Sequence, residues 1–349
     1  MIPDLVWLAP AQWLPPTAEK AADALAEGRI TAEAAESMGY DQLPVSTDES
    51  APEMAVRAAR LALARAGVPA AGLSAVLHAW TYYQGHDFWS PAHYVAAGIG
   101  ADGAVPLGIQ QMCNGAAGAL ETALHRVAFS APGTGAVLAT TADRFARPGF
   151  DRWSGDYGVW YGDGATAAVV GRAAGAAAVP ERAVTLRALA TRAAPALESA
   201  HRDTDAFGTA PRTRGDTVDI RRTKKAFLAA HGRPEFLDRL RRETSTVLAE
   251  ALRQADLGPR ARSLRAVLLP RLGRATARDV YGPAVAELTD APPVDLGERS
   301  GHLGAGDLFA NLAALCSGTG PLRLERGEHA AVLSAGAGFT WTAVVVHRP

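Results

Sequence analysis

The chain has 349 residues, a formal net charge of −1 at pH 7 and only two cysteines. This length can bury one large core or two smaller ones. The near-zero net charge excludes the overall basic field that is typical of nucleic-acid binding. Two cysteines are too few for a disulfide scaffold and fit a reducing cytoplasm. Residues 1–7 carry no basic side chain, and no apolar run is long enough to span a bilayer. We therefore expect a cytoplasmic protein without a signal peptide.

The first half of the sequence alternates predicted helices and strands. A helix is expected over residues 52–66, because apolar side chains recur along it, Glu53 lies in its first turn and Gly67 follows it. Short apolar runs predict buried strands at 73–79, 104–109, 135–140 and 165–170. Strands separated by helices favour parallel pairing in a sheet that is covered on both faces. The fold class is therefore predicted to be α/β.

The second half repeats this order of elements. A helix over 244–256 is followed by a Gly-Pro break and a strand over 264–270, as the helix over 52–66 is followed by a strand. The runs 330–334 and 339–346 predict a hairpin, and 163–189 resembles one more loosely. The shared order indicates an internal duplication, although the residue-level match is weak. We divide the chain into an N-terminal half, 1–172, and a C-terminal half, 173–349.

Between the halves, residues 194–233 are polar and irregular, and the stretch is rich in basic side chains. It contains Arg212, Arg214, Arg221, Arg222, Lys224 and Lys225. One interpretation is a solvated loop. The other is a basic lip that receives an acidic carrier protein or a phosphate group.

Cys113 is the main candidate for a functional residue. It follows the predicted strand 104–109 and precedes small residues and an apolar-periodic run, a pattern that predicts a strand-to-helix turn. The unpaired amides and the dipole at a helix N-terminus favour the thiolate, which is the nucleophilic form of cysteine. The alternative is a buried structural cysteine, which is common.

Five segments together carry a resemblance to a known family. They are QMCNG at 111–115, YGDGA at 161–165, LLP at 268–270, GHLGAGD at 301–307 and GAGFTW at 336–341. In this order the chain resembles β-ketoacyl-acyl-carrier-protein synthase III of the thiolase superfamily. The resemblance implies a thiolase-like fold of two similar α/β halves in five layers, and a homodimer. It also implies that Cys113, in the N-terminal half, accepts an acyl group from a thioester.

Two positions depart from the condensing members of this family. Those members carry a His after the LLP-like strand and an Asn in the late Gly-rich loop, which together stabilise the enolate formed by decarboxylation. This chain has Arg271 and His302 at those positions. An arginine is neither a neutral donor nor a base at neutral pH. The standard decarboxylative condensation is therefore not expected.

The segment 301–307 resembles instead the acyltransferase branch of these enzymes in natural-product, polyketide-type pathways. The resemblance implies a triad of Cys113, His302 and Asp307, the last two in the C-terminal half. His302 would take a proton from Cys113 or from the acceptor, and Asp307 would orient the imidazole. The alternative is that His302 fills a polar loop and that Asp307 caps a helix over 308–315.

Further roles follow from the same resemblance. The backbone amides of Cys113 and Ala337 are expected to form an oxyanion hole. Arg271 is expected to bind a substrate carboxylate or a pantetheine phosphate. The donor would be an acyl-phosphopantetheine on an acyl carrier protein, or acyl-CoA, with no permanently bound cofactor. A small-molecule acceptor is the other expected partner, and the histidine spacings do not predict a metal site.

Other residues admit plainer interpretations. Cys316 is expected to lie in the core. Two aromatic-rich stretches, 80–89 and 153–161, either pack in a core or dimer interface or form a wall of an acyl pocket. Our main hypothesis is an acyltransferase that moves an acyl group from a carrier or CoA thioester to a hydroxyl, an amine or a second carrier thiol. The alternatives are a starter-unit condensing enzyme, a non-catalytic partner that binds a carrier protein, and, less strongly, a thioester hydrolase.

Overall fold

The computed structural model describes residues 5–317 and 322–349. Residues 1–4, which belong to the segment where we expect no signal peptide, lie outside the described residues. Ten strands form one large sheet whose order is β10-β9-β11-β12-β8-β1-β7-β6-β4-β5. The strands of the N-terminal half are β1 (Val6–Trp13), β4 (Leu73–Ala79), β5 (Val105–Ile109), β6 (Ala136–Asp143) and β7 (Gly164–Arg172). Those of the C-terminal half are β8 (Val184–Ala193), β9 (Leu264–Leu268), β10 (Pro293–Val294), β11 (His329–Gly336) and β12 (Thr340–His347).

The two halves of the sheet have the same internal order. Reading outward from the centre, β1-β7-β6-β4-β5 matches β8-β12-β11-β9-β10 in position. In each half two outer pairings are parallel, β4 with β5 and β6 and β9 with β10 and β11, and the inner pairings are antiparallel. This matched topology is the structural counterpart of the repeated order of elements in the sequence.

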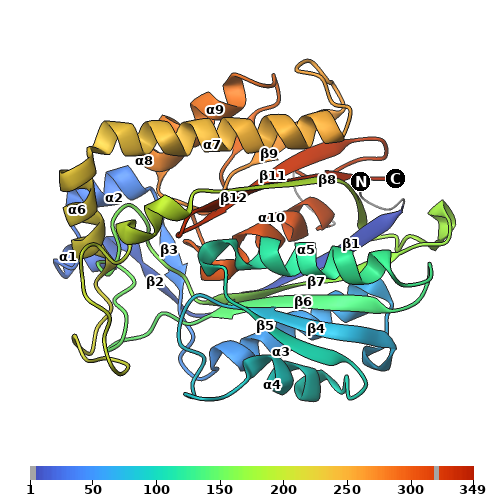
Figure 1. Ribbon diagram of the computed structural model, residues 1–349, viewed down its shortest axis with the longest axis horizontal. Coiled ribbons are helices and arrows are strands. Elements are labelled where there is room, and N and C mark those ends of the chain that lie inside the picture. Colours follow the sequence, from blue (N-terminus) through green and yellow to red (C-terminus); the bar gives the residue numbers. More distant parts are fainter. Residues whose placement is uncertain (1–4, 318–321) are drawn as a thin grey trace.

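Helices separate and cover the two halves of the sheet. Figure 1 shows α5 (Gly115–Ala128) and α10 (Asp307–Cys316) between them, α7 (Arg233–Gln254) over one outer face, and α3 (Ala51–Ala66) and α4 (Pro91–Ile99) over the other. Three hydrophobic clusters follow this layering: one joins α5 and α10 to both halves, one lies under α3 and one lies under α7. The predicted α/β class with two similar halves in layers is confirmed.

Smaller elements surround one end of these layers. They are β2 (Ala18–Lys20), β3 (Gln42–Pro44), α1 (Ala21–Ala26), α2 (Ala32–Met38), α6 (Ile220–His231) and α8 (Arg274–Thr276). Figure 1 places α1, α2 and α6 together at that end. Another short helix, α9 (Gly282–Ala286), lies beside α7 on its outer side (Figure 1). Among the described residues, none of the helices combines the length and the apolar character needed to cross a membrane.

Two sequence-based expectations about elements were wrong. The loosely predicted hairpin over 163–189 does not exist, because β1 lies between β7 and β8 and pairs antiparallel with both. The stretch 194–233 is not irregular throughout, because it contains α6, whose first turn is capped by Asp219 accepting the backbone N–H of Arg222 at 3.0 Å. The helix predicted over 244–256 begins earlier, at Arg233.

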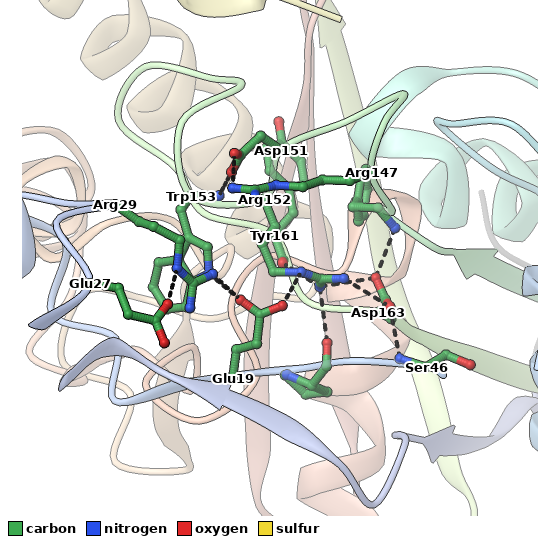
Figure 2. Close-up of polar contacts among 12 residues, drawn as sticks. Glu19, Glu27, Arg29, Ser46, Arg147, Asp151, Arg152, Trp153, Tyr161 and Asp163 are labelled. Carbon is green, nitrogen blue, oxygen red and sulfur yellow. Dashed lines mark hydrogen bonds and ion pairs between the residues drawn. The ribbon is translucent and has the colours of Figure 1, made fainter. Parts of the chain in front are cut away.

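A buried ion pair ties together the segments that flank this end of the sheet. Figure 2 shows the guanidinium of Arg152 facing the carboxylate of Asp163. Two parallel contacts of 3.1 Å join them, and the two side chains are 6% and 0% exposed. Asp163 also accepts the backbone N–H groups of Ser46 and Phe145. Arg152 donates to the carbonyl of Tyr161, so this network positions the segment that carries Tyr161.

We expect Arg152→Met to lower the free energy of unfolding by about 3–5 kcal/mol, because it leaves a buried carboxylate without its cation. Urea denaturation measures this loss. Arg253→Met is the matched control, since Arg253 forms an ion pair with Glu250 on the surface, where its side chain is 71% exposed. That change should leave the free energy of unfolding nearly unchanged, because water screens an exposed ion pair. Equal losses for the two variants would contradict a stabilising role for the buried pair.

Candidate active site

Cys113 lies in a tight turn between a strand and a helix, as the sequence predicts. After β5 ends at Ile109, the chain forms a single 3₁₀ turn, Met112–Asn114, that leads directly into α5. Met112 has a φ of 49°, a left-handed conformation that is uncommon for a residue with a side chain. Such backbone conformations cluster at functional turns. The turn places the Cys113 thiol beside the N-terminus of α5, and the thiol borders a cavity.

Close backbone approaches bring two other segments to this turn. A Cβ at Gly336, the last residue of β11, would lie 2.5 Å from the backbone nitrogen of Asn114. A Cβ at Gly115 would lie 3.0 Å from the Cβ of Ala305. Larger residues at these two positions would therefore push the β11–β12 hairpin and the His302–Asp307 segment away from the nucleophile. The small residues of the two motifs allow the site to assemble.

His302 is fixed by its own backbone. Its N–H donates to the carbonyl of Trp160 at 2.9 Å, and its carbonyl accepts the N–H of Gly162 at 3.0 Å. These bonds form an isolated parallel bridge between His302 and Tyr161. The imidazole is almost fully buried, with its Nδ1 2.6 Å from the Asp307 Oδ2. This contact leaves Nε2 as the ring nitrogen that is free for Cys113.

The electrostatics of the three side chains favour a charged imidazole. Burial alone would lower the pKa of His302, but the charge of Asp307, the charge of Cys113 and hydrogen bonds with both side chains raise it well above its ordinary value. The pKa of Asp307 is lowered, because the attraction of His302 outweighs the effect of burial. Asp307 also accepts the N–H groups of Leu303, at 2.9 Å, and Arg271, at 2.8 Å, so it is held in place on three sides.

A second buried carboxylate holds the loop that carries His302. Asp143 accepts the backbone N–H of Ala305 at 3.0 Å and those of Thr81 and Tyr82 at 2.9 and 2.8 Å. Burial raises the pKa of Asp143 to about 6 in spite of these bonds. Gly304, with a φ of 57°, lies directly against this carboxylate, and any side chain there would collide with it. Asp143 thus acts as a support for the loop and does not border the cavity.

The structure places Arg271 differently from the sequence-based expectation. Its side chain is buried and donates to Asn311 at 3.0 Å and to Ser300 at 2.8 Å, behind Asp307. It is not among the described residues that line the cavity. Its location favours a supporting role for the Asp307 side of the triad over the substrate contact that we expected.

The cavity beside Cys113 has a volume of about 400 Å³. Cys113, His302 and Ala337 all border it, so the structure brings the predicted nucleophile, base and second oxyanion residue to one space. Most of the wall is apolar or aromatic, including Phe227, Leu240, Tyr281, Phe339 and Trp341. The geometry can accommodate an acyl group bound to Cys113. The oxyanion role of the two amides remains a prediction.

The two aromatic stretches have different locations. Tyr157, Trp160 and Tyr161 of the second stretch border the cavity, whereas no described residue of 80–89 does. Within the first stretch Phe88 is fully exposed and Trp89 partly so. Cys316, which we expected in the core, lies in α10 at the edge of the central cluster, where it is half-buried and packed against the cluster, and burial raises the pKa of its thiol to about 12.

Sequence reasoning missed a second polar group in the cavity wall. Asp156, His201 and Lys224 border the cavity, and the carboxylate of Asp156 lies between Lys224 and Tyr161. Lys224 was noted only as one of several basic residues, and the other two were not singled out. The one usable signal was the position of Asp156 within the aromatic stretch 153–161, where a lone carboxylate among aromatic side chains needs a buried partner.

Comparisons with known proteins agree with this architecture. No model of a protein family matches the chain, and no curated protein sequence matches it significantly. Among solved structures, ChlB3, described as an acyltransferase, has a TM-score of 0.86 and 28% identity over 98% of this chain and 97% of its own. The 3-oxoacyl-[acyl-carrier-protein] synthase III of Aquifex aeolicus has a TM-score of 0.75 and 19% identity over 98% and 99%. AbyA1, a tetronic acid condensing enzyme, has a TM-score of 0.75 and 20% identity over the same shares.

Proposed function

We propose that this chain, a ketosynthase III-like protein of the thiolase superfamily close to its acyltransferase branch, transfers an acyl group from a thioester to an acceptor through an acyl-Cys113 intermediate. The observation that carries the proposal is the arrangement of the triad. Cys113 and His302 border one cavity, the charge of Cys113 is one cause of the raised pKa of His302, and Asp307 lies behind the imidazole at 2.6 Å. A nucleophile, a base and an orienting carboxylate in this order are what covalent acyl transfer needs.

In the first step the Cys113 thiolate attacks the carbonyl carbon of the donor thioester. A new carbon–sulfur bond forms, and the bond to the donor sulfur breaks. The donor leaves as a free thiol after taking the proton from the His302 imidazolium. The backbone amides of Cys113 and Ala337 are the proposed donors to the transient oxyanion, each contributing about 3 kcal/mol in comparable enzymes.

Acylation itself prepares the second step. The negative charge of Cys113 is one cause of the raised pKa of His302, and this charge disappears when the sulfur becomes a thioester. By then the imidazole has given its proton to the leaving thiol, and the pKa of His302 is lower than in the free enzyme. His302 can then remove the proton from an acceptor hydroxyl, amine or thiol, which attacks the acyl carbon and releases Cys113.

The position of Arg271 supports acyl transfer over condensation. Decarboxylation of a malonyl-type thioester needs two neutral donors at the enolate oxygen. Here the first of these positions holds a buried arginine whose side chain is directed to Ser300 and Asn311. Of these two positions, only the one occupied by His302 places a hydrogen-bond donor at the cavity. A malonyl-type group, if used, would thus be transferred intact.

The donor is proposed to be an acyl carrier protein or CoA, and the cavity mouth offers cations for it. Arg221 and Arg233 are exposed and border the cavity. Other basic residues of the predicted lip have partners, since Arg214 and Arg222 both pair with Asp205. These two exposed cations suit the phosphates of a pantetheine arm or the acidic surface of a carrier protein.

A homodimer is also proposed. β5 lies at one edge of the sheet, and its Val105 and Leu107 are 47% and 38% exposed. Phe88 and Trp89 add exposed aromatic surface. An apolar sheet edge in a soluble protein calls for a partner, and a second copy can pair with it strand to strand. Sedimentation as a monomer at micromolar concentration would contradict this part of the proposal.

The test of the reaction class uses a panel of acyl-CoA thioesters that includes malonyl-CoA labelled at the free carboxyl carbon. Intact-protein mass spectrometry should show one acyl mass per chain for at least one thioester. That acyl group should then move to an added acceptor such as a carrier thiol. Release of labelled carbon dioxide together with a β-keto product would favour the condensing alternative, and no acyl mass with any thioester would favour the non-catalytic partner.

A further inference from the structure

The cavity contains a second polar cluster, formed by Asp156, His201 and Lys224, that the triad does not use. The ammonium of Lys224 lies 2.6 Å from Asp156 Oδ1, and the hydroxyl of Tyr161 donates to Oδ2 at 2.6 Å. Asp156 is 2% exposed, and the Lys224 side chain is 18% exposed. Lys224 comes from α6, whereas Asp156 lies in the loop before β7, so the pair joins two separate parts of the wall.

This cluster has hydrogen-bonding capacity that the described residues do not fill. An ammonium group has three donors, and Lys224 forms its one ion pair with Asp156. Burial and the nearby charge of Lys224 lower the pKa of His201 to about 3, so its imidazole is neutral and supplies one donor and one acceptor. Neither ring nitrogen of His201 has a hydrogen-bond partner among the described residues, and its ring contacts the edge of Phe339.

The surroundings make these unfilled groups selective. Phe227, Leu228, Phe236 and Phe339 border the same cavity. A purely hydrocarbon acyl group would displace water from the cluster and leave its donors unpaired, which is costly in an apolar site. A hydroxyl or carbonyl oxygen would pair with them. A carboxylate fits less well, because Asp156 and Lys224 already balance each other and a further negative charge would be uncompensated.

The cluster also lies close to the triad. The ring of Tyr161 is 5.2 Å from that of His302, between centroids, and its hydroxyl contacts Asp156. The cluster is therefore about one tyrosine side chain away from the triad. Cys113, His201 and Lys224 all border the one cavity, so an acyl group on Cys113 shares that space with the cluster.

We infer that the acyl group carried by this enzyme has a hydroxyl or carbonyl oxygen on its distal part, and that Lys224 and His201 bind this oxygen. The inference rests on the proposed acyl transfer, since it names the substrate class of the same cavity. Asp156 holds the Lys224 ammonium toward this oxygen and is itself held by Tyr161. Lys224 and His201 are thus specificity-determining residues.

The experiment compares three pairs of CoA thioesters that differ in one oxygen: 3-hydroxybutyryl with butyryl, 4-oxopentanoyl with pentanoyl, and 5-oxohexanoyl with hexanoyl. The rate of acyl-enzyme formation should favour the oxygenated member of at least one pair by about tenfold or more, the effect expected when buried donors are left unpaired. Lys224→Met and His201→Phe should each reduce that ratio by slowing the oxygenated substrate and sparing the plain one. His201→Phe leaves the Asp156–Lys224 pair intact, so it remains informative if Lys224→Met fails to fold.

Lys225→Met is the matched control, because it makes the same substitution one position along α6 at an exposed residue. It should leave the ratio unchanged. Binding of the same thioesters to Cys113→Ala, measured by thermal shift, separates this inference from the proposed reaction. If Cys113→Ala binds the oxygenated thioester more tightly but the wild type forms no acyl-enzyme, the proposed acyl transfer is contradicted and the oxygen-binding subsite is supported. Equal or better acylation by the plain member of every pair would overturn the subsite and keep the acyl transfer, and absence of both binding and acylation would overturn the two together.

Discussion

Cys113→Ala should lose acyl transfer almost completely, by at least about 10⁴-fold, because removal of the nucleophile in comparable covalent enzymes costs that much or more. The sulfur of Cys113 carries the acyl group in the proposed reaction, and the structure places it at the N-terminus of α5, on the cavity that His302 also borders. Intact-protein mass spectrometry should find the acyl mass on the wild type and none on the variant. Transfer to an acceptor should fall in parallel.

The second cysteine provides the control for this prediction. Cys316 is packed in α10, and the raised pKa of its thiol keeps it protonated at neutral pH. Cys316→Ala should therefore acquire the same acyl mass as the wild type, at a similar rate. Acylation of Cys113→Ala to the wild-type extent would remove Cys113 from the mechanism.

Local patterns in the sequence were sufficient for much of the fold. The strand over 73–79 coincides with β4, and the helix over 52–66 differs from α3 by one residue. The helix has clear boundary signals: Ser50 and Glu53 form a capping box at its start, and Gly67 ends it in a left-handed conformation. Where a segment's own residues determine its boundaries, the prediction succeeds.

Elements determined by tertiary contacts were missed. β1 contains Pro10, and proline within a strand ordinarily argues against a central position. In the structure β1 is nevertheless central, because β7 and β8 flank it. α6 was missed because its sequence is rich in basic residues and buries only Thr223 and Phe227, although Ile220, Phe227 and Leu228 recur at helical spacing.

The candidate site was also predictable only in part: its short motifs could be recognised, but the contacts between distant segments could not. Cys113, His302 and Asp307 each belong to a short motif, and their grouping in one site came from the family resemblance. The orientation of Arg271 was not predictable, because it depends on Ser300 and Asn311, which are distant in sequence. The pairing of Asp156 with Lys224 likewise requires that α6 pack beside the loop before β7, which no local pattern specifies.

His302→Ala should slow acyl transfer by about 100-fold or more, the usual contribution of a general acid–base group. The imidazolium stabilises the Cys113 thiolate in the free enzyme and, once neutral, activates the acceptor, so both steps should suffer. The raised pKa of His302 favours a protonated imidazole beside Cys113 at neutral pH. Alkylation of Cys113 by iodoacetamide at neutral pH should therefore also slow in the variant, and single-turnover kinetics should show a loss in acylation and deacylation alike.

Asp307→Asn separates orientation from charge at the same site. Asn has nearly the same size, but it has one acceptor oxygen where Asp307 uses two, Oδ1 for the N–H of Leu303 and Oδ2 for that of Arg271. The variant therefore loses one of these bonds together with the charge that raises the pKa of His302, so thermal denaturation is measured alongside transfer. The rate of acyl transfer should fall, and the fall should be largest at pH values where the His302 imidazole is protonated in the wild type but no longer in the variant.

One outcome would contradict the role of His302. If His302→Ala kept the wild-type rates of acyl transfer and of Cys113 alkylation, His302 would be only a structural residue of its loop. Because its backbone bonds to Trp160 and Gly162 do not involve the side chain, the alanine variant keeps that loop in place and makes the test one of chemistry.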